Sequence, residues 1–204
     1  MDVQRFSPDL APVIAKVHCE AFAGYMNTRL GSGYVRRFLA WFASRPDAIA
    51  LAALDERGEA FGYVVGAPLG YGKAMTRDLL IPAAVGVIRK PSLLVDRRIL
   101  RTALGRVLDL AGRPPTIAPP PLLPSPTWSL VGIGVASRAR GMGLGQRLTR
   151  AFEDEARRLG ARAVRLSVYK ENTTARHTYE KCGWVPFDGP VPPGFAMYYS
   201  KQLG

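Results

Sequence analysis

The chain has 204 residues, of which 48% are hydrophobic and 22% charged; this is enough for one packed domain and excludes a disordered tail or a fibrous repeat. Its net charge of +12 favours an anionic partner, such as a nucleic acid, a nucleotide-like cofactor or an anionic membrane surface. Two cysteines and two histidines argue against a disulfide framework and against a bound metal ion.

Residues 1–66 are predicted to form a strand, two helices and a β-hairpin. The strand lies around Val3–Phe6, and Ser7 with the proline after it indicates where the first helix begins. Two apolar runs, 48–54 and 60–65, flank a Gly-containing turn and therefore predict an antiparallel hairpin. The first residues lack the basic and apolar pattern of a secretory signal, so we expect a cytoplasmic protein with reduced cysteines.

Residues 67–126 have a different character and are predicted to form a basic helical insertion within one domain that spans residues 1–204. They carry nine Lys or Arg residues against three Asp residues, and a proline cluster ends the segment. The longest apolar run, Leu79–Ile88, is too short to span a bilayer, which takes about 20 residues. We therefore expect no transmembrane helix here.

The order of elements after the insertion is typical of an α/β core with a mixed sheet. An apolar strand at 128–135 leads through a Gly-rich turn into a helix at 144–159. A second strand at 163–169 and a second helix at 172–182 follow, and terminal strands complete the chain. The insertion thus lies between the third and fourth predicted strands.

The turn Arg140–Gly145 reads Arg-Gly-Met-Gly-Leu-Gly. Its alternate glycines let the backbone approach a ligand, and the free amides of the following helix attract an anion. The turn therefore predicts a pyrophosphate site, although a flexible Gly-rich connector also fits. A P-loop is excluded because Gln146 and Arg147 follow where Lys and Ser or Thr are needed. A dinucleotide fold is disfavoured because the next strand ends in 167–170, without the expected acidic residue.

The helix after this turn is predicted to be amphipathic. One face repeats apolar side chains at helical spacing and is expected to pack on the sheet. On the other face, Glu153 with Arg157 and Asp154 with Arg158 are expected to form exposed i, i+4 ion pairs.

A second motif follows the second strand. Asn172 is placed to cap a helix, and Ala175, Tyr179 and Cys182 share one face of it before Gly183 ends the helix. Taken alone, this pattern also fits plain capping and a core aromatic residue. Cys182 fits a small buried residue better than a nucleophile.

The two motifs together resemble those of the GNAT acetyltransferase superfamily. Arg140–Gly145 resembles the Gln/Arg-x-x-Gly-x-Gly/Ala signature, and 172–184 resembles the second motif of Asn, Ala, Tyr and Gly followed by an aromatic residue. The resemblance is closest over 128–188, extends to 1–66 and leaves out 67–126. It implies a GNAT-like acyltransferase fold in which acetyl-CoA lies in a V-shaped gap between two splayed parallel strands.

The resemblance also implies a role for each matching residue. Backbone groups of the first core strand would hold the pantetheine, amides of the Gly-rich turn would hold the pyrophosphate, and Asn172 belongs to the same cofactor-binding set. Tyr179 would be the catalytic residue, facing the departing sulfur. Arg138 would add positive charge. The strand and turn residues in this set are Ile133, Gly134, Val135, Arg140, Gly141, Met142, Gly143, Leu144 and Gly145.

The implied reaction is direct attack of a primary amine on acetyl-CoA in a ternary complex, without a metal ion. An amide near Ile133–Val135 would stabilise the oxyanion. An alkyl amine is mostly protonated at pH 7, so a base is expected. Glu20 and His18 are candidates because the core strand offers no carboxylate, and a water relay to backbone carbonyls is an alternative.

The acceptor stays open at this point. It is a small molecule or amino sugar, or else a protein lysine or N-terminal amine; a non-catalytic GNAT-like module and a nucleic-acid-binding module are the alternatives to an enzyme. Tyr25 and Arg29 are candidates for the acceptor side. The basic insertion fits extra packing helices, a wall of the acceptor site, or a surface for an anionic membrane or lipid-linked acceptor. Both a monomer and a homodimer fit the sequence.

Overall fold

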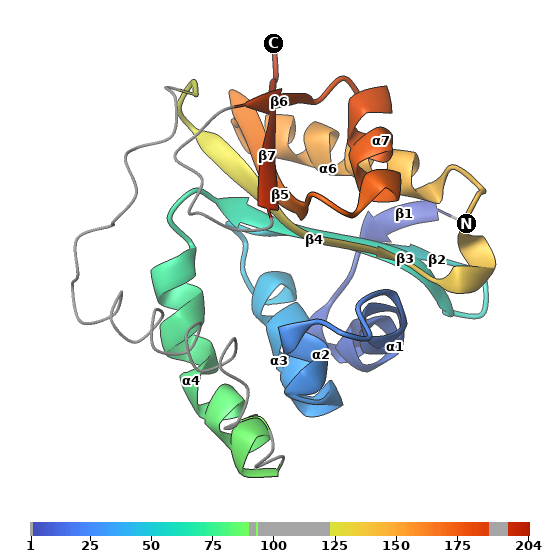
Figure 1. Cartoon of the computed structure of the whole chain (residues 1–204), viewed down its shortest axis with the longest axis vertical. Coiled ribbons are helices and arrows are strands. Elements are labelled where there is room, and N and C mark those ends of the chain that lie inside the picture. The colour runs from blue at the N-terminus through green and yellow to red at the C-terminus, as the bar shows by residue number, and fades with distance from the viewer. Residues whose placement is uncertain (1, 90–92, 94–122, 188–195) are drawn as a thin grey trace.

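The computed structural model describes residues 2–89, 93, 123–187 and 196–204. Its centre is a seven-stranded sheet in the order β1-β2-β3-β4-β5-β7-β6 (Figure 1). All neighbouring strands are antiparallel except β4 and β5, which are parallel. The strands are β1 (Asp2–Arg5), β2 (Ile49–Leu54), β3 (Ala60–Pro68), β4 (Thr127–Val135), β5 (Ala163–Tyr169), β6 (Val185–Phe187) and β7 (Ala196–Gln202). The expected α/β fold with a mixed sheet is confirmed.

Helices cover both faces of the sheet (Figure 1). The first group is α1 (Ala11–Ala21), α2 (Met26–Arg29), α3 (Ser32–Ala43) and α4 (Gly72–Arg89). The second group, on the opposite face, is α6 (Leu144–Arg158) and α7 (Thr173–Lys181). Each group packs its apolar residues into a separate core cluster, so the sheet is buried on both sides. A single turn of 3-10 helix, Pro8–Leu10, precedes α1, and Ser7 provides no side-chain cap there.

The segment between β3 and β4 begins with α4, which packs on α3. Leu79 is buried at this contact, and Trp41 Nε1 donates a hydrogen bond to Asp78 Oδ2 at 3.0 Å. Most of the predicted insertion lies outside the described residues, so its boundaries within a single domain stay a prediction. None of the described helices is both long and apolar enough to cross a membrane.

The parallel strands β4 and β5 pair for only three residues. Thr127, Trp128 and Ser129 face Ala163, Val164 and Arg165, and the ladder then stops although both strands continue. On its other side β4 pairs with β3 along its length, but Val131 is an extra residue between two paired positions. The two strands therefore separate toward their carboxyl ends.

The face of α6 that packs on the sheet is buried as the sequence predicts. Leu148 and Phe152 are fully buried against β3, where glycines leave room for them. A Cβ built on Gly62 would lie 2.8 Å from Leu148 Cδ1. Glycine on β3 therefore sets how closely α6 approaches the sheet.

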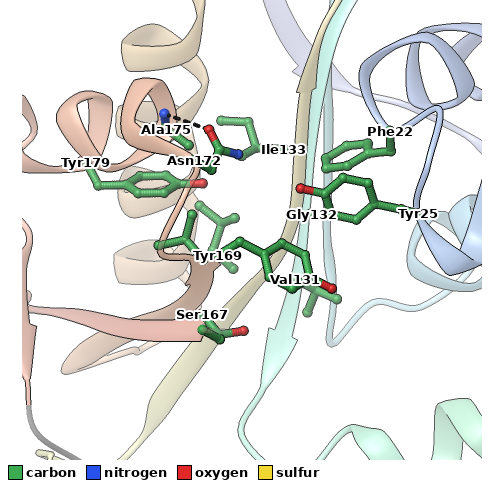
Figure 2. A pocket seen from close by; sticks show the side chains of 13 residues that line it. Phe22, Tyr25, Val131, Gly132, Ile133, Ser167, Tyr169, Asn172, Ala175 and Tyr179 are labelled. Carbon is green, nitrogen blue, oxygen red and sulfur yellow. Dashed lines mark hydrogen bonds between the residues drawn. The ribbon is translucent and has the colours of Figure 1, made fainter. Parts of the chain in front are cut away.

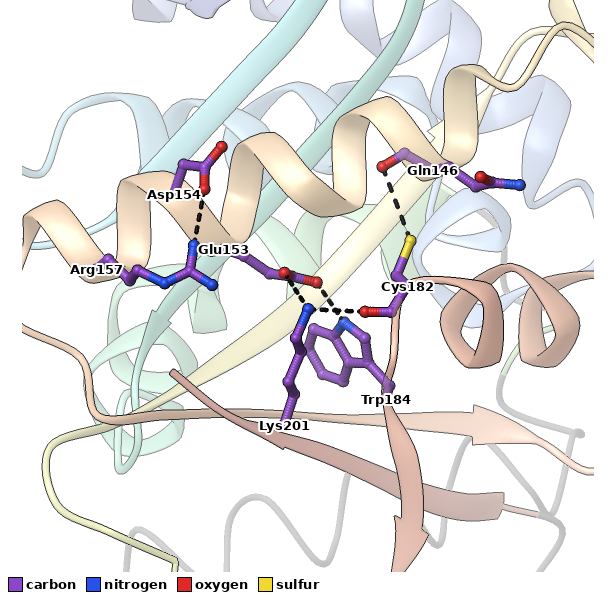
Figure 3. Close-up of polar contacts among 7 residues, drawn as sticks. All are labelled: Gln146, Glu153, Asp154, Arg157, Cys182, Trp184 and Lys201. Carbon is purple, nitrogen blue, oxygen red and sulfur yellow. Dashed lines mark hydrogen bonds and ion pairs between the residues drawn. The ribbon is translucent and has the colours of Figure 1, made fainter. Parts of the chain in front are cut away.

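The predicted charge pairs of α6 are wrong. Glu153 is 3% exposed and accepts hydrogen bonds from Trp184 Nε1 at 2.7 Å and from Lys201 Nζ at 2.6 Å (Figure 3). Lys201 also donates to Cys182 O at 2.7 Å. These partners come from β7 and from the segment after α7, so the helical spacing of α6 alone does not reveal them. The structure instead pairs Arg157 with Asp154 at the surface.

Replacing Lys201 by methionine should destabilise the protein. The change leaves a buried carboxylate on Glu153 with one hydrogen-bond donor in place of two, and we expect unfolding in urea to show a loss of about 3 kcal/mol. The exposed pair supplies the control, because Arg157→Ala should cost less than about 1 kcal/mol. The double variant with Glu153→Gln should recover much of the loss. Equal losses in the two single variants would contradict this account.

Candidate functional site

A cavity of about 310 Å³ lies where β4 and β5 separate (Figure 2). Its walls come from β4, from the end of β5, from α7 and from the connection between α1 and α2. Its lining residues are Phe22, Tyr25, Leu130, Val131, Gly132, Ile133, Ser167, Val168, Tyr169, Asn172, Ala175, Tyr179 and Ala196. The gap in the ladder thus becomes a cavity that is bordered by the second predicted motif and by the connection between α1 and α2.

Tyr179 enters the cavity from α7. Its side chain is 5% exposed, its ring packs near those of Trp184 and Tyr199, and its hydroxyl points into the cavity. Burial raises the pKa of Tyr179 well above its usual value, and Tyr25 adds to the shift. The hydroxyl therefore stays protonated at neutral pH and is suited to donate a hydrogen bond.

Asn172 lines the cavity and caps α7. Its Oδ1 accepts a hydrogen bond from Ala175 N at 3.1 Å, which fixes the first turn of the helix. The capping interpretation of this residue is therefore confirmed. Asn172 also lines the cavity, where its side chain lies close enough to Tyr25 to affect the pKa of that residue.

An aromatic wall, defined here as Phe22, Tyr25 and Tyr169, closes the side of the cavity nearest α1. The rings of Tyr25 and Tyr169 meet edge to face at 5.3 Å, and those of Phe22 and Tyr25 do so at 5.0 Å. The hydroxyls of Tyr25 and Tyr179 point into the cavity from opposite sides (Figure 2). Burial raises the pKa of Tyr25 above its usual value, and the nearby Tyr169 adds to this shift.

Sequence reasoning named Tyr25 but missed Phe22 and Tyr169. The three residues come from two distant segments, and no spacing in the chain links them. Tyr169 was seen only as the end of a strand. On β4 the cavity is lined by residues 130–133, and the bulge at Val131 within this stretch cannot be predicted from an apolar run.

Of the three strand residues predicted to hold the cofactor, only Ile133 lines the cavity. Gly134 and Val135 continue β4 beside β3, where they pair with Tyr63 and Gly62. A Cβ on Gly134 would lie 2.7 Å from Tyr63 Cε1, so this glycine makes room for a buried ring. The structure thus gives Gly134 a packing function that the sequence did not indicate.

The Gly-rich turn lies beside α7 and keeps its backbone open. Gly141 and Gly143 have φ values of +79° and +71°, which side chains other than glycine rarely adopt, and a Cβ on either would meet nothing within 4 Å. Gly145 lies against α7, since its Cβ would be 3.4 Å from Thr178 Cγ2. No side chain caps α6 at Gly143, so its first amides are available to an anion.

Three further members of the predicted pyrophosphate site lie within this turn. Arg140 and Met142 are exposed, and Leu144 is buried where it begins α6. Arg138 points elsewhere, because its guanidinium binds Glu59 Oε2 at 3.1 Å and stacks over Phe61. The structure therefore brings the predicted turn residues together and ties Arg138 to β3 and the hairpin turn before it.

Glu20 binds the backbone just before the Gly-rich turn and is a weakened base. Its Oε1 accepts a hydrogen bond from Ser137 N at 2.7 Å. This bond lowers the pKa of Glu20, and Arg140 and Arg138 lower it further. Glu20 does not line the cavity.

His18 is a buried core residue. Its Nδ1 lies 2.5 Å from the Tyr63 hydroxyl, and its ring packs on Phe22 and Phe38. Its Nε2 is buried and has no hydrogen-bond partner among the described residues. Burial lowers the pKa of His18 to about 4, so the ring is neutral at pH 7 and a weak base. His18 likewise does not line the cavity.

Within the described part of the chain, no three side chains of the metal-binding types cluster together. The polar groups of the cavity are hydroxyls, one amide side chain and the backbone of β4. The described lining therefore offers a ligand neutral hydrogen-bonding groups.

Comparison with known proteins gives a family model and a set of solved structures. The model described as the acetyltransferase (GNAT) family matches residues 18–184. SsHAT matches with a TM-score of 0.68 and 23% identity over 100% of this chain and 98% of that one. The PaiA N-acetyltransferase of Thermoplasma acidophilum, solved in complex with coenzyme A, matches with a TM-score of 0.61 and 14% identity over 98% of both chains.

A third solved structure is Naa20 of Chaetomium thermophilum in complex with a bisubstrate analogue. It matches with a TM-score of 0.56 and 20% identity over 100% of this chain and 87% of that one. None of the curated proteins compared with the chain matches it. At these identities, the likeness to the solved structures is one of fold.

The burial of His18 predicts a loss of stability in mild acid. Because its folded pKa of about 4 is below the usual 6.5, the unfolded state binds the proton more tightly, and stability falls as the pH drops from about 6.5 to about 4. We expect a loss of about 3 kcal/mol in urea unfolding across this range. His177→Gln, at the exposed histidine, should keep the slope and His18→Gln should remove it. The same slope in both variants would contradict the assignment.

Proposed function

The chain belongs to the GNAT acetyltransferase family, and from this premise we propose that it transfers the acetyl group of acetyl-CoA to a primary amine by direct attack. The observation that carries the proposal is the cavity between the separated β4 and β5, with the Tyr179 hydroxyl on one side of it. We place the acceptor among small molecules, because it has to reach the thioester between the two walls that Tyr25 and Tyr179 form on opposite sides of the cavity. Acetyl-CoA is the acetyl donor of this family, and its thioester supplies the electrophilic carbonyl.

The described residues fit acetyl-CoA at both ends of the site. The open space over Gly141 and Gly143 and the uncapped start of α6 suit a pyrophosphate, with the exposed Arg140 nearby. Beyond Ser129, β4 has no ladder with β5, so its backbone is free to form strand-like hydrogen bonds with the amides of pantetheine. We therefore assign the turn to the pyrophosphate and the β4 edge through Ile133 to the pantetheine.

Two groups of the chain would act on the reacting atoms. A backbone amide of β4 near the bulge at Val131 would donate to the oxyanion, because an extra residue lies outside the ladder with β3. Tyr179 would donate a hydrogen bond to the leaving sulfur. Its raised pKa makes complete proton transfer to a thiolate unfavourable, so we assign it stabilisation of the thiolate by hydrogen bonding.

Binding of acetyl-CoA tests the cofactor assignment. We expect calorimetry to give micromolar binding to the wild type and a loss of more than about tenfold in Gly143→Glu, because the new carboxylate repels the pyrophosphate. Gly160→Glu is the matched control: Gly160 has a φ of +84° and open space, and it lies at the other end of α6. Equal affinity in the two variants, or no binding by the folded wild type, would contradict the proposal.

Removal of the Tyr179 hydroxyl tests the chemistry. Tyr179→Phe should lower kcat by about 10² or more and leave the Kd for acetyl-CoA nearly unchanged, because the hydroxyl acts on charge that develops during reaction. Tyr34→Phe is the control, since Tyr34 is buried to a similar degree in α3 and does not line the cavity. Acetyl transfer is followed through the free thiol of the product. A kcat within twofold of the wild type in Tyr179→Phe would remove this residue from the mechanism.

A further inference from the structure

We propose that the acceptor is an aromatic amine of low basicity, whose ring packs against the aromatic wall of Phe22, Tyr25 and Tyr169. This inference rests on the proposed acetyl transfer and names the class of amine that the same cavity would take. Three features of the cavity carry it: the placement of the aromatic wall, the neutrality of the described lining, and the lack of a competent base at the described lining.

The aromatic wall and the proposed donor site lie on different sides of the cavity. The Gly-rich turn and Tyr179 belong to α6 and α7, on one face of the sheet, whereas Phe22 and Tyr25 follow α1 on the opposite face. An acceptor would therefore approach from the α1 side and meet these rings first. Edge-to-face and offset contacts of aromatic rings favour a flat aromatic ligand at this position.

The described lining of the cavity is electrically neutral. Its polar side chains are the three tyrosines together with Ser167 and Asn172, and the other described lining residues are apolar. A carboxylate beside the cavity would be the natural partner of an ammonium group, and an ammonium buried without such a partner is costly. A neutral amine enters this cavity without the cost of burying an unpaired charge.

The groups near the cavity do not suit removal of a proton from an ammonium ion. At pH 7 only about one alkyl amine in 2,500 is deprotonated. Glu20 is bound to Ser137 N with its pKa lowered, and His18 is buried against Tyr63 with a pKa of about 4. Glu171 is close enough to contribute to the raised pKa of Tyr25, but it is exposed and does not line the cavity. The pKa of Tyr25 is raised, so this residue donates a hydrogen bond more readily than it accepts a proton.

An aromatic amine needs no base before it attacks. Its nitrogen is already neutral at pH 7, and its lone pair forms the new C–N bond to the acetyl carbon. The C–S bond then breaks with its electron pair left on sulfur, where the Tyr179 hydroxyl donates a hydrogen bond. The nitrogen becomes strongly acidic once the C–N bond has formed, so its proton passes to water.

Two isomeric amines test the proposal with the same number of atoms. 4-Methylaniline has its nitrogen on the ring and is weakly basic, whereas benzylamine is a strongly basic alkyl amine. We expect kcat/KM for 4-methylaniline to be flat between pH 6 and 9, and that for benzylamine to rise about tenfold per pH unit in this range. At pH 7 the aromatic isomer should be preferred by about tenfold or more. A preference for benzylamine with a flat profile would overturn the proposal.

The contribution of the aromatic wall is tested at Tyr25. The KM for 4-methylaniline should rise about tenfold in Tyr25→Ala and by less in Tyr25→Phe, because only alanine removes the ring. Calorimetry with acetyl-CoA on both variants separates this effect from general damage to the site. Equal changes in KM in the two variants would overturn the role of the ring.

A lysine peptide without aromatic residues separates this proposal from the proposed function. Acetylation of the peptide in preference to both isomers would overturn the aromatic acceptor and leave acetyl transfer standing. Acetyl-CoA binding without acetylation of any of the three amines would overturn both. Acetylation of 4-methylaniline ahead of the peptide supports the proposal.

Discussion

The site depends on the early separation of two parallel strands. β4 and β5 share only three paired positions, after which β5 continues its ladder with β7 and β4 its ladder with β3. Each strand keeps one neighbour, so the sheet stays intact while a gap opens at its centre. An open gap in the middle of a sheet exposes backbone groups that seek hydrogen bonds. The fold thereby opens a candidate binding site along the backbone, and α7 and the connection between α1 and α2 supply its walls together with the two strands.

The proposed site also requires α6 and α7 to keep their positions relative to each other. Lys201 links Glu153 of α6 to the carbonyl of Cys182 at the end of α7, and Trp184 completes the contact (Figure 3). Gly145 packs closely against Thr178, and this contact places the first turn of α6 against α7. These contacts therefore fix the position of the proposed pyrophosphate site relative to Tyr179 on one face of the sheet.

The proton chemistry of the site follows from the burial of His18 and Tyr179 and from the hydrogen bond that Glu20 accepts. Although the chain carries a net charge of +12, the described cavity lining is neutral, and the nearby Glu20 and His18 are engaged by Ser137 and Tyr63. Positive charge is instead found at exposed arginines such as Arg140, beside the proposed pyrophosphate site. The proposed donor site is thus positively charged, whereas the proposed acceptor side is neutral.

The sequence by itself determined the local features. The alternate glycines predict an open turn, and the apolar periodicity predicts the strands and helices. The spacing of Asn172 and Tyr179 places both residues on one helix. Such features depend on residues that are only a few positions apart, so they can be predicted from the local sequence. The tertiary structure alone decided the burial of Glu153, the engagement of Glu20 and His18, the bulge at Val131 and the meeting of Tyr25 with Tyr169. These depend on partners from distant segments, because burial and pairing across a sheet are set by how the chain packs and not by spacing along it.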